Sequence, residues 1–196
     1  MDGRYDDDKS LVFTYGQSTA TTVPGNGSRA LFSIRVAPSV DQGIAAAFGT
    51  RELTNRMQLT LRNLDLTTST TNANLLVRAY LNSSPVGTTT TWTNAVGGVT
   101  GLVNSSLAQI ADYASSGAIT ISGGEVAAGF FVGTGANSID LSQVRDLRNS
   151  IVGGGGTSSN TQIYPDGPDT LTIVVTNLVG TAATVFGRLS WTEAQA

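Results

Sequence analysis

A chain of 196 residues is long enough for one domain with a sizeable core, and its 40% of hydrophobic residues can supply that core. Only 13% of the residues are charged and the net charge is −3, which excludes the basic surface that nucleic acids and anionic membranes attract. Cysteine and histidine are both absent, which excludes disulfides, thiolate metal sites and histidine-based catalysis.

The first nine residues, MDGRYDDDK, are acidic and polar, the reverse of a secretory signal peptide. We expect residues 1–9 to form an exposed N-terminal arm and residues 10–196 to fold as a single β-sandwich domain. Asp6, Asp7 and Asp8 could hold a divalent cation loosely, but a charge run on a terminal arm is usually solvated. No apolar run approaches the ~20 residues of a transmembrane helix, so no membrane span is expected.

The first clear alternating pattern is RALFSIRVA, in which the apolar Phe32, Ile34 and Val36 alternate with Ser33 and Arg35. A period of two residues is typical of a strand with one buried face and one exposed face. We therefore predict a half-buried strand at this position.

Apolar and polar residues alternate more cleanly in the segment RMQLTLRNL. One predicted face carries Met57, Leu59 and Leu61, and the other carries Gln58, Thr60 and Arg62. We expect the apolar set to face the core and the polar set to face solvent.

Further β-prone runs, separated by Gly, Pro, Asn and Ser, lie along the rest of the chain. They occupy residues 11–16, 74–81, 88–93, 117–123, 125–133, 170–177 and 183–191. Short strands with turn chemistry between them are typical of sandwiches, jelly rolls and barrels. We predict an all-β fold: an antiparallel β-sandwich, jelly-roll-like, with one or two short helices.

Two segments depart from the period of a strand. The segment SIDLSQVRDLRNSI, at residues 138–151, spaces its apolar residues at helical intervals, and Asp140 could cap the start of a helix. Its predicted helical face carries Leu141, Val144, Leu147 and Ile151. The segment SSLAQIADYASSG, at residues 105–117, fits either a short helix or an irregular strand.

Two aspartates, Asp166 and Asp169, lie close together in YPDGPDTL. Pro165, Gly167 and Pro168 around them favour a tight turn. We interpret Asp166 as a turn residue, and Asp169 as a residue whose side chain accepts a hydrogen bond from a nearby backbone N–H before the next strand. A calcium site would need roughly 6 to 8 oxygen ligands, and no Asp-rich loop of that kind surrounds the pair.

Catalytic candidates are few. A serine nucleophile needs an activating base, and without histidine only Lys9 could serve, but its aspartate neighbours favour the protonated ammonium. The composition permits one other enzyme class, a carboxylate-based hydrolase such as a β-sandwich glycosidase. Its acid pair would come from Glu52, Glu125, Glu193 or the aspartates, but their spacing selects no two of them. We expect no enzyme activity, no catalytic or cofactor-binding residue and no metal site.

Aromatic residues could stack on sugars in a carbohydrate-binding module, and the candidates are Trp92, Trp191, Tyr80 and Tyr113. Both tryptophans, however, lie on predicted strands. An aromatic side chain on a strand normally packs into the core or into a subunit contact.

Neutral Ser and Thr side chains are abundant, and arginine outnumbers lysine ten to one. Burying an unpaired ion costs several kcal/mol, so a neutral surface is easier to desolvate when proteins associate. Interfaces are depleted in charge at their centres and favour arginine and aromatic residues. The composition therefore favours a protein that assembles with copies of itself.

Seven segments carry a resemblance to known proteins: RALFSIRVAPSVDQG, ELTNRMQLTLRNL, SSLAQIADY, GGEVAAGFFVG, IDLSQVRDLRNSIVGGG, YPDGPDTLTIVVTN and GRLSWTEAQA. They resemble virion structural proteins of marine tailed phages, particularly of phages that infect cyanobacteria. The resemblance extends from about residue 11 to the C-terminus. It implies a non-enzymatic component of the particle, present in many copies, in a head decoration, tail or fibre.

We therefore expect a homo-oligomeric virion structural protein whose partners are copies of itself and other virion proteins. The alternative is a receptor- or carbohydrate-binding module, for example a fibre tip, whose aromatic residues and loops at 82–104 contact a host-surface glycan. Neither nucleic acid nor a membrane is an expected partner. The tryptophans separate the two hypotheses: burial of Trp92 and Trp191 at a subunit contact favours assembly, and joint exposure in one groove favours sugar binding.

Overall fold

The computed structural model describes residues 11–37, 57–87, 89–95, 106–116, 119–144, 151–152 and 169–194. The predicted arm at residues 1–9, with its three aspartates and Lys9, lies outside these ranges, as do Glu52 and Asp166. Within them the chain forms fourteen strands and a single turn of 3-10 helix. None of the described residues belongs to a helix long and apolar enough to cross a membrane.

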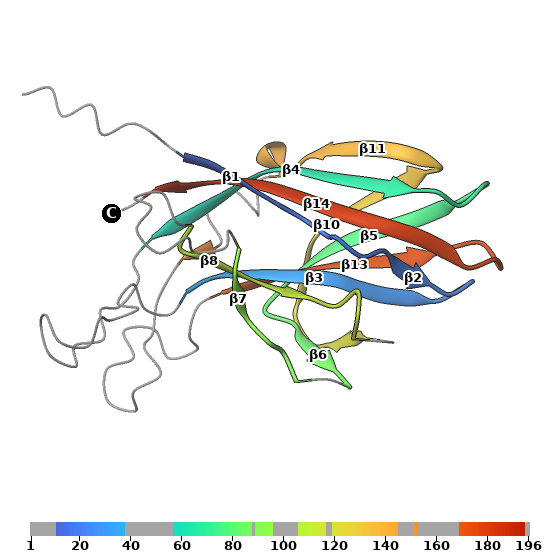
Figure 1. The fold of residues 1–196 in the computed structure, drawn as a ribbon, viewed down its shortest axis with the longest axis horizontal. Helices are drawn as coiled ribbons and strands as arrows, with labels where there is room; N and C mark the ends of the chain where they lie inside the picture. Colours follow the sequence, from blue (N-terminus) through green and yellow to red (C-terminus); the bar gives the residue numbers. More distant parts are fainter. Residues whose placement is uncertain are drawn as a thin grey trace, which may run out of the picture.

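Two antiparallel sheets pack face to face (Figure 1). Sheet A contains, in spatial order, β1 (Leu11–Gly16), β14 (Ala183–Ala194), β4 (Gln58–Thr68) and β11 (Gly135–Asp140), with β2 (Thr21–Val23) paired to β14 and β12 (Ile151–Val152) paired to β4. Sheet B contains β10 (Glu125–Gly133), β5 (Asn74–Leu81), β13 (Thr170–Asn177), β3 (Ser28–Val36), β8 (Ala108–Asp112) and β7 (Thr93–Asn94). A small third sheet pairs β6 (Ser84–Val86) with β9 (Thr120–Ser122). The predicted all-β antiparallel sandwich is therefore confirmed, and the jelly-roll-like connectivity stays a prediction.

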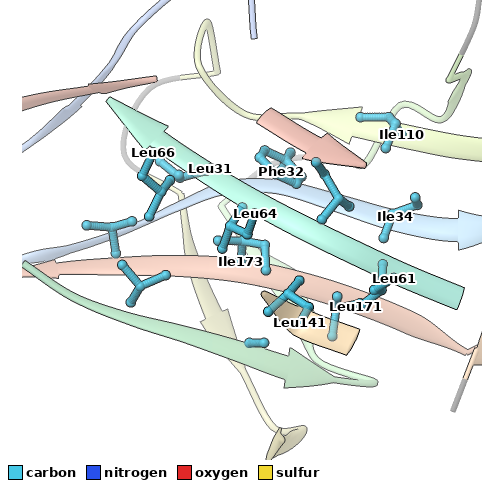
Figure 2. Close-up of a cluster of buried hydrophobic side chains, with 14 of the residues drawn as sticks. Leu31, Phe32, Ile34, Leu61, Leu64, Leu66, Ile110, Leu141, Leu171 and Ile173 are labelled. Atoms are coloured by element: carbon cyan, nitrogen blue, oxygen red, sulfur yellow. The ribbon is translucent and has the colours of Figure 1, made fainter. Parts of the chain in front are cut away.

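The main core lies between sheets A and B, where leucine, isoleucine and phenylalanine side chains from both sheets interdigitate (Figure 2). Its labelled members are Leu31, Phe32, Ile34, Leu61, Leu64, Leu66, Ile110, Leu141, Leu171 and Ile173. Burial of each such large side chain contributes about 1.5–3 kcal/mol to folding. This shared layer is the main reason that the two sheets stay together.

The predicted faces of β4 are confirmed. Met57, Leu59 and Leu61 are buried, whereas Gln58 and Arg62 are exposed and Thr60 is partly buried. Leu64 pairs with Leu189 but Leu61 pairs with Trp191, so β4 carries one extra residue between these two pairs. This bulge leaves both Arg62 and Asn63 exposed and returns Leu64 to the core.

The prediction of a half-buried strand at β3 is wrong about its polar face. Ser33 is only 1% exposed, and its hydroxyl lies 2.9 Å from the Tyr113 hydroxyl and 2.7 Å from that of Thr172. A second apolar cluster covers this outer side of sheet B, so the strand is buried on both faces. The cluster contains Ala30, Ala111, Tyr113, Ile119 and Val174, with Tyr80, Trp92 and Ile121 packed against it.

The predicted helix at residues 138–151 is wrong for most of the residues that can be compared. The segment from Gly135 to Asp140 is β11, and only η1 (Leu141–Gln143) is helical. Because β4 satisfies the backbone groups of β11, the helical spacing of apolar residues does not decide the local structure. Asp140 does cap the turn, since its Oδ1 accepts hydrogen bonds from the Ser142 hydroxyl at 2.5 Å and from the Ser142 N–H at 2.9 Å, and these two bonds lower the pKa of the exposed Asp140 carboxyl.

The segment at residues 105–117 was predicted as either a short helix or an irregular strand, and the strand is observed, as β8. Asp112, the last residue of β8, accepts a hydrogen bond from Tyr15 of β1. The next residue, Tyr113, donates its backbone N–H to the Leu31 carbonyl of β3. Tyr113 also contacts Ser33, as described above.

Candidate binding face

The outer surface of sheet A is broad and rich in neutral polar groups. On β1, β14, β4 and β11, residues between the buried apolar positions point to this side, and we call it the A face. It is defined by Thr14, Asp65, Thr67, Ser138, Arg188 and Ser190. Five of these residues alternate with buried residues, so the period of the strands places them outside, and Ser138 lies on the same side because it pairs with Asp65.

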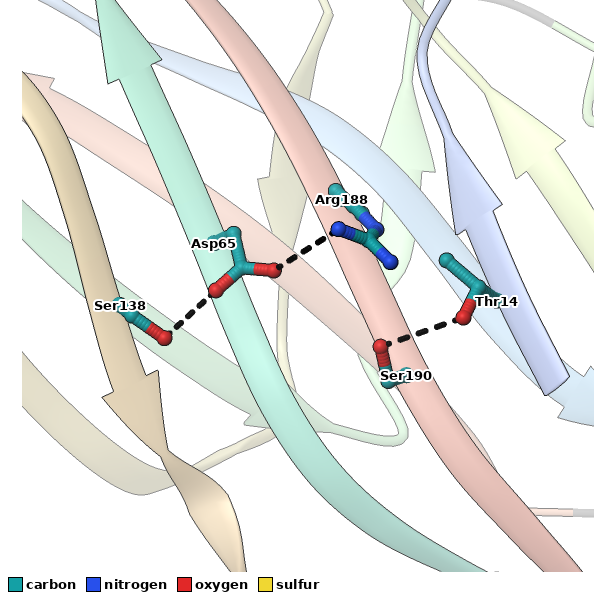
Figure 3. A network of polar contacts seen from close by, with 5 residues as sticks. All are labelled: Thr14, Asp65, Ser138, Arg188 and Ser190. Carbon is teal, nitrogen blue, oxygen red and sulfur yellow. Dashed lines mark hydrogen bonds and ion pairs between the residues drawn. The ribbon is translucent and has the colours of Figure 1, made fainter. Parts of the chain in front are cut away.

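A series of polar contacts crosses the four strands of the A face (Figure 3). The Ser138 hydroxyl on β11 donates a 2.6 Å hydrogen bond to Oδ1 of Asp65 on β4. Oδ2 of Asp65 lies 3.8 Å from Nη1 of Arg188 on β14, and the hydroxyls of Ser190 and Thr14 lie 3.4 Å apart. The Arg188 side chain is 59% exposed, so its ion pair contributes at most about 1 kcal/mol to stability. These groups therefore remain accessible to a partner.

An open depression of about 560 Å³ lies on this face, and its volume falls within the ~300–1,000 Å³ typical of ligand sites. Its lining comprises Gly16, Gln17, Asp65, Thr67, Ala136, Asn137, Ser138, Phe186, Gly187 and Arg188. Phe186 adds an apolar ring that is 38% exposed. Asp65 is the one carboxylate in this lining, so the depression offers hydrogen-bonding groups and one ion pair but no pair of acids.

The structure separates Glu125 and Glu193, two of the carboxylates considered as catalytic candidates. Glu125 is exposed at the start of β10 in sheet B, whereas Glu193 is buried on β14 in sheet A. Among the residues that the structure describes, no group of three or more acidic side chains is arranged to hold a metal ion.

Asp169 lies directly before β13, as predicted, but its hydrogen bond differs from the predicted one. Oδ1 of Asp169 accepts a 2.8 Å hydrogen bond from the Asn82 side-chain amide. The Asn82 side-chain oxygen in turn accepts a 2.9 Å hydrogen bond from the Thr170 backbone N–H, so Asn82, and not Asp169, pairs with a backbone donor at the start of β13. Asn82 has a φ of 53°, a conformation that asparagine adopts more readily than most residues.

Glu193 is a buried polar residue that the sequence patterns did not single out for this structural role. Its carboxylate accepts hydrogen bonds from the Ser106 hydroxyl at 2.5 Å, the Leu107 backbone N–H at 3.0 Å and the Trp191 indole N–H at 2.8 Å. Ser106 and Leu107 lead into β8 of sheet B, so this carboxylate links the two sheets. Three donors compensate for the burial of the carboxylate.

The four candidate aromatic residues do not form one exposed platform. Trp191 is fully buried in the main core and stacks on Phe13, with 6.1 Å between ring centroids. Trp92 is partly buried on the outer side of sheet B, with the Arg35 guanidinium 4.2 Å from its ring centroid. Tyr80 and Tyr113 belong to that same second cluster. Trp191 therefore packs inside the subunit. It lies neither at a subunit contact nor in an exposed groove, so its position favours neither assembly nor sugar binding.

The sequence matches no known family model, and no curated protein matches it. Inference about function therefore depends on the chemistry of the exposed surfaces, above all on the A face with its hydroxyl groups and its single Asp65–Arg188 pair.

Proposed function

We propose that this chain is a non-enzymatic structural protein of a virion, in a head decoration, tail or fibre, and that it assembles with copies of itself and with other virion proteins. The observation that carries the proposal is the A face. Across four strands it presents Thr and Ser side chains, one aspartate–arginine pair and the exposed ring of Phe186. Such a face loses little hydration energy when a second protein covers it.

The particle setting is supported by the resemblance to virion structural proteins of marine tailed phages. Several of the segments that carry this resemblance contribute strands to the A face. They are ELTNRMQLTLRNL with β4, IDLSQVRDLRNSIVGGG at the end of β11, and GRLSWTEAQA with β14. Localisation to the virion follows as part of the proposal.

Light scattering of the purified protein tests self-assembly. We expect a defined oligomer that persists in about 1 M NaCl, where the Debye length is only about 3 Å, because few charge pairs would hold the contact. The substitution Thr67→Lys on the A face should raise the dissociation constant at least about tenfold, since it buries an ammonium group. Ser122→Lys, on the exposed part of β9, is the matched control and should leave association unchanged. A protein that stays monomeric at high micromolar concentration would contradict the proposal.

A receptor- or glycan-binding function is the second candidate, and the depression on the A face is the observation that favours it. Asp65, Ser138 and Arg188 could hydrogen-bond sugar hydroxyls beside the ring of Phe186. Binding to host-surface glycans that is lost in Asp65→Ala and retained in Glu125→Ala would favour this function. Equal binding by the two variants would count against it.

A further inference from the structure

Strand β10 forms one edge of sheet B. Among the described residues it pairs only with β5, along Glu125–Gly133, and no described strand pairs with its other side. The outward N–H and C=O groups of an edge strand are available to pair with a strand of another molecule. The opposite edge strand of the sheet, β7, has only two residues and offers a much shorter edge.

The sequence of β10, EVAAGFFVG, lacks the features that normally protect an edge. Soluble proteins block exposed edges with lysine, proline, inward-pointing charges or very short strands. This strand has nine residues, contains neither lysine nor proline, and carries its only charge, Glu125, at its first position. A bulge between Val126 and Ala128 disturbs one end and leaves residues 128–133 in regular register with β5.

The two faces of β10 differ: one packs against the main core and the other exposes an apolar side chain. Phe130 and Val132 pair with Val77 and Leu75 on the side that packs against the main core. Phe131 points to the outer side and is 74% exposed, the most exposed large hydrophobic residue of the described chain. An apolar side chain of this size beside an open edge gains most if another strand covers it.

We propose that β10 pairs antiparallel with β10 of a second copy of this chain, which joins two B sheets into one continuous sheet. This pairing deepens the self-assembly proposed above and rests on it. A two-fold axis through Phe130 places Gly129 opposite the partner's Phe131 and Ala128 opposite the partner's Val132. The axis keeps core-facing residues opposite core-facing residues, whereas a shift of one residue would mix the two faces.

Complementarity in this register favours a second copy as the partner. Each Phe131 ring lies against the bare backbone of the partner's Gly129, an arrangement in which an aromatic residue covers an edge glycine. The two Phe130 rings meet at the axis. Glu125 lies outside the paired residues 128–133, so the two negative charges are not brought together. An isologous contact requires a patch that complements itself in this way.

The substitution Phe131→Lys tests the pairing, because it adds to the edge the charge that protected strands carry. We expect the dimer dissociation constant in sedimentation equilibrium to rise at least about tenfold. Val86→Lys is the matched control, since Val86 is 45% exposed on β6, in the small third sheet, and should leave the constant unchanged. Fluorescence of the buried Trp191 confirms that both variants are folded.

Disulfide formation tests the register. The natural chain has no cysteine, so introduced thiols are the only ones present. An added Cβ at Gly129 would lie 3.9 Å from its nearest neighbours, so Gly129→Cys should fold. Oxidation of a mixture of Gly129→Cys and Phe131→Cys should give mainly the mixed dimer, because these positions are opposite each other.

The outcomes distinguish this inference from the proposed function. A wild-type protein that oligomerises while Phe131→Lys associates equally well would overturn the β10 pairing and leave self-assembly intact. Mainly same-variant disulfide dimers would overturn the register with its axis at Phe130. A wild-type protein that is monomeric at every concentration would overturn self-assembly itself, and the β10 pairing with it.

Discussion

Tyr15 on β1 connects the two sheets, and its ionisation makes the stability of the fold depend on pH. Its phenolic hydroxyl donates a hydrogen bond to Oδ2 of Asp112 on β8, and the ring packs edge-on against Phe32. Burial raises the pKa of Tyr15, and the hydrogen bond to Asp112 together with the negative charge of that carboxylate raises it further. Asp112 is also held by Gln17 Nε2 at 2.9 Å and by the Ala114 N–H at 2.8 Å.

This raised pKa predicts a loss of stability at alkaline pH. Above about pH 10 the unfolded state loses the Tyr15 proton while the folded state keeps it, so the stabilisation is complete below pH 10 and declines as the pH rises further. Tyr15→Phe removes this contribution. The variant should be less stable than wild type by about 1 kcal/mol at pH 7, and the difference should shrink above pH 10.

Urea unfolding between pH 7 and 11 measures the difference between wild type and Tyr15→Phe. The slope cannot exceed about 1.4 kcal/mol per pH unit, the limit for one proton. Tyr113, whose pKa burial also raises, is present in both proteins, so its contribution cancels. A difference that is constant from pH 7 to 11 would contradict the role assigned to the Tyr15 hydroxyl.

Strand β14 lies close to side chains of β3 at a glycine, Gly187. A Cβ added at Gly187 would lie 2.7 Å from Cε1 of Phe32 and 3.2 Å from Cδ1 of Leu31. Both neighbours are fully buried, because a bulge in β3 directs two consecutive side chains into the core. Gly187→Ala should therefore lower the free energy of unfolding by about 1–3 kcal/mol, as is usual for overpacking.

Gly16 on β1 supplies the control for this substitution. A Cβ there would lie 3.9 Å from Cγ of Arg188, an ordinary contact, so Gly16→Ala should change stability by no more than about 0.5 kcal/mol. Denaturant unfolding compares the two variants. Equal stability of Gly187→Ala and Gly16→Ala would show that β3 can move away from β14.

The strands that alternate cleanly could be predicted from the sequence because their pattern is local, as the confirmed faces of β4 show. The burial of Ser33 could not be predicted, because most residues of the cluster that covers β3 are far from Ser33 in the sequence. Of the predicted strand at 88–93, the structure describes residues 89–93, and among these only Thr93, which begins β7, belongs to a strand. Partial burial of Trp92 beneath Arg35 stabilises this segment without a ladder of strand hydrogen bonds.

The A face was missed for a related reason. Asp65 and Arg188 face each other because β4 and β14 pair in one particular register, and nothing near either residue reveals that pairing. The failed helix prediction at 138–151 has the same cause, since β4 also pairs with β11. Local periodicity predicts which side of a strand a residue occupies, whereas the choice of partner strand depends on the whole core.

Besides the Tyr15–Asp112 hydrogen bond, Gln17 and Glu193 connect sheet A to sheet B. Gln17 joins them at one position: its Oε1 accepts from the Gly187 N–H at 3.0 Å, and its Nε2 donates to the Leu31 carbonyl at 3.1 Å. Glu193 joins them at a second position through Ser106 and Leu107. Apolar packing holds sheets together without fixing their relative position, whereas directional hydrogen bonds fix it.

Glu193→Gln tests the second contact, because every neighbour of this carboxylate is a donor. The Ser106 oxygen already accepts from the Ala108 N–H at 3.1 Å, so its proton points to Glu193. A glutamine must direct its NH2 either at the Leu107 N–H or at the donors of Ser106 and Trp191. Each orientation leaves buried donors unpaired, and the free energy of unfolding should fall by about 1–3 kcal/mol.

Guanidinium unfolding followed by tryptophan fluorescence measures this loss of stability. The exposed Glu125→Gln is the control and should change stability by less than about 0.5 kcal/mol. If both variants were as stable as wild type, the sheets would be held by apolar packing alone at this position.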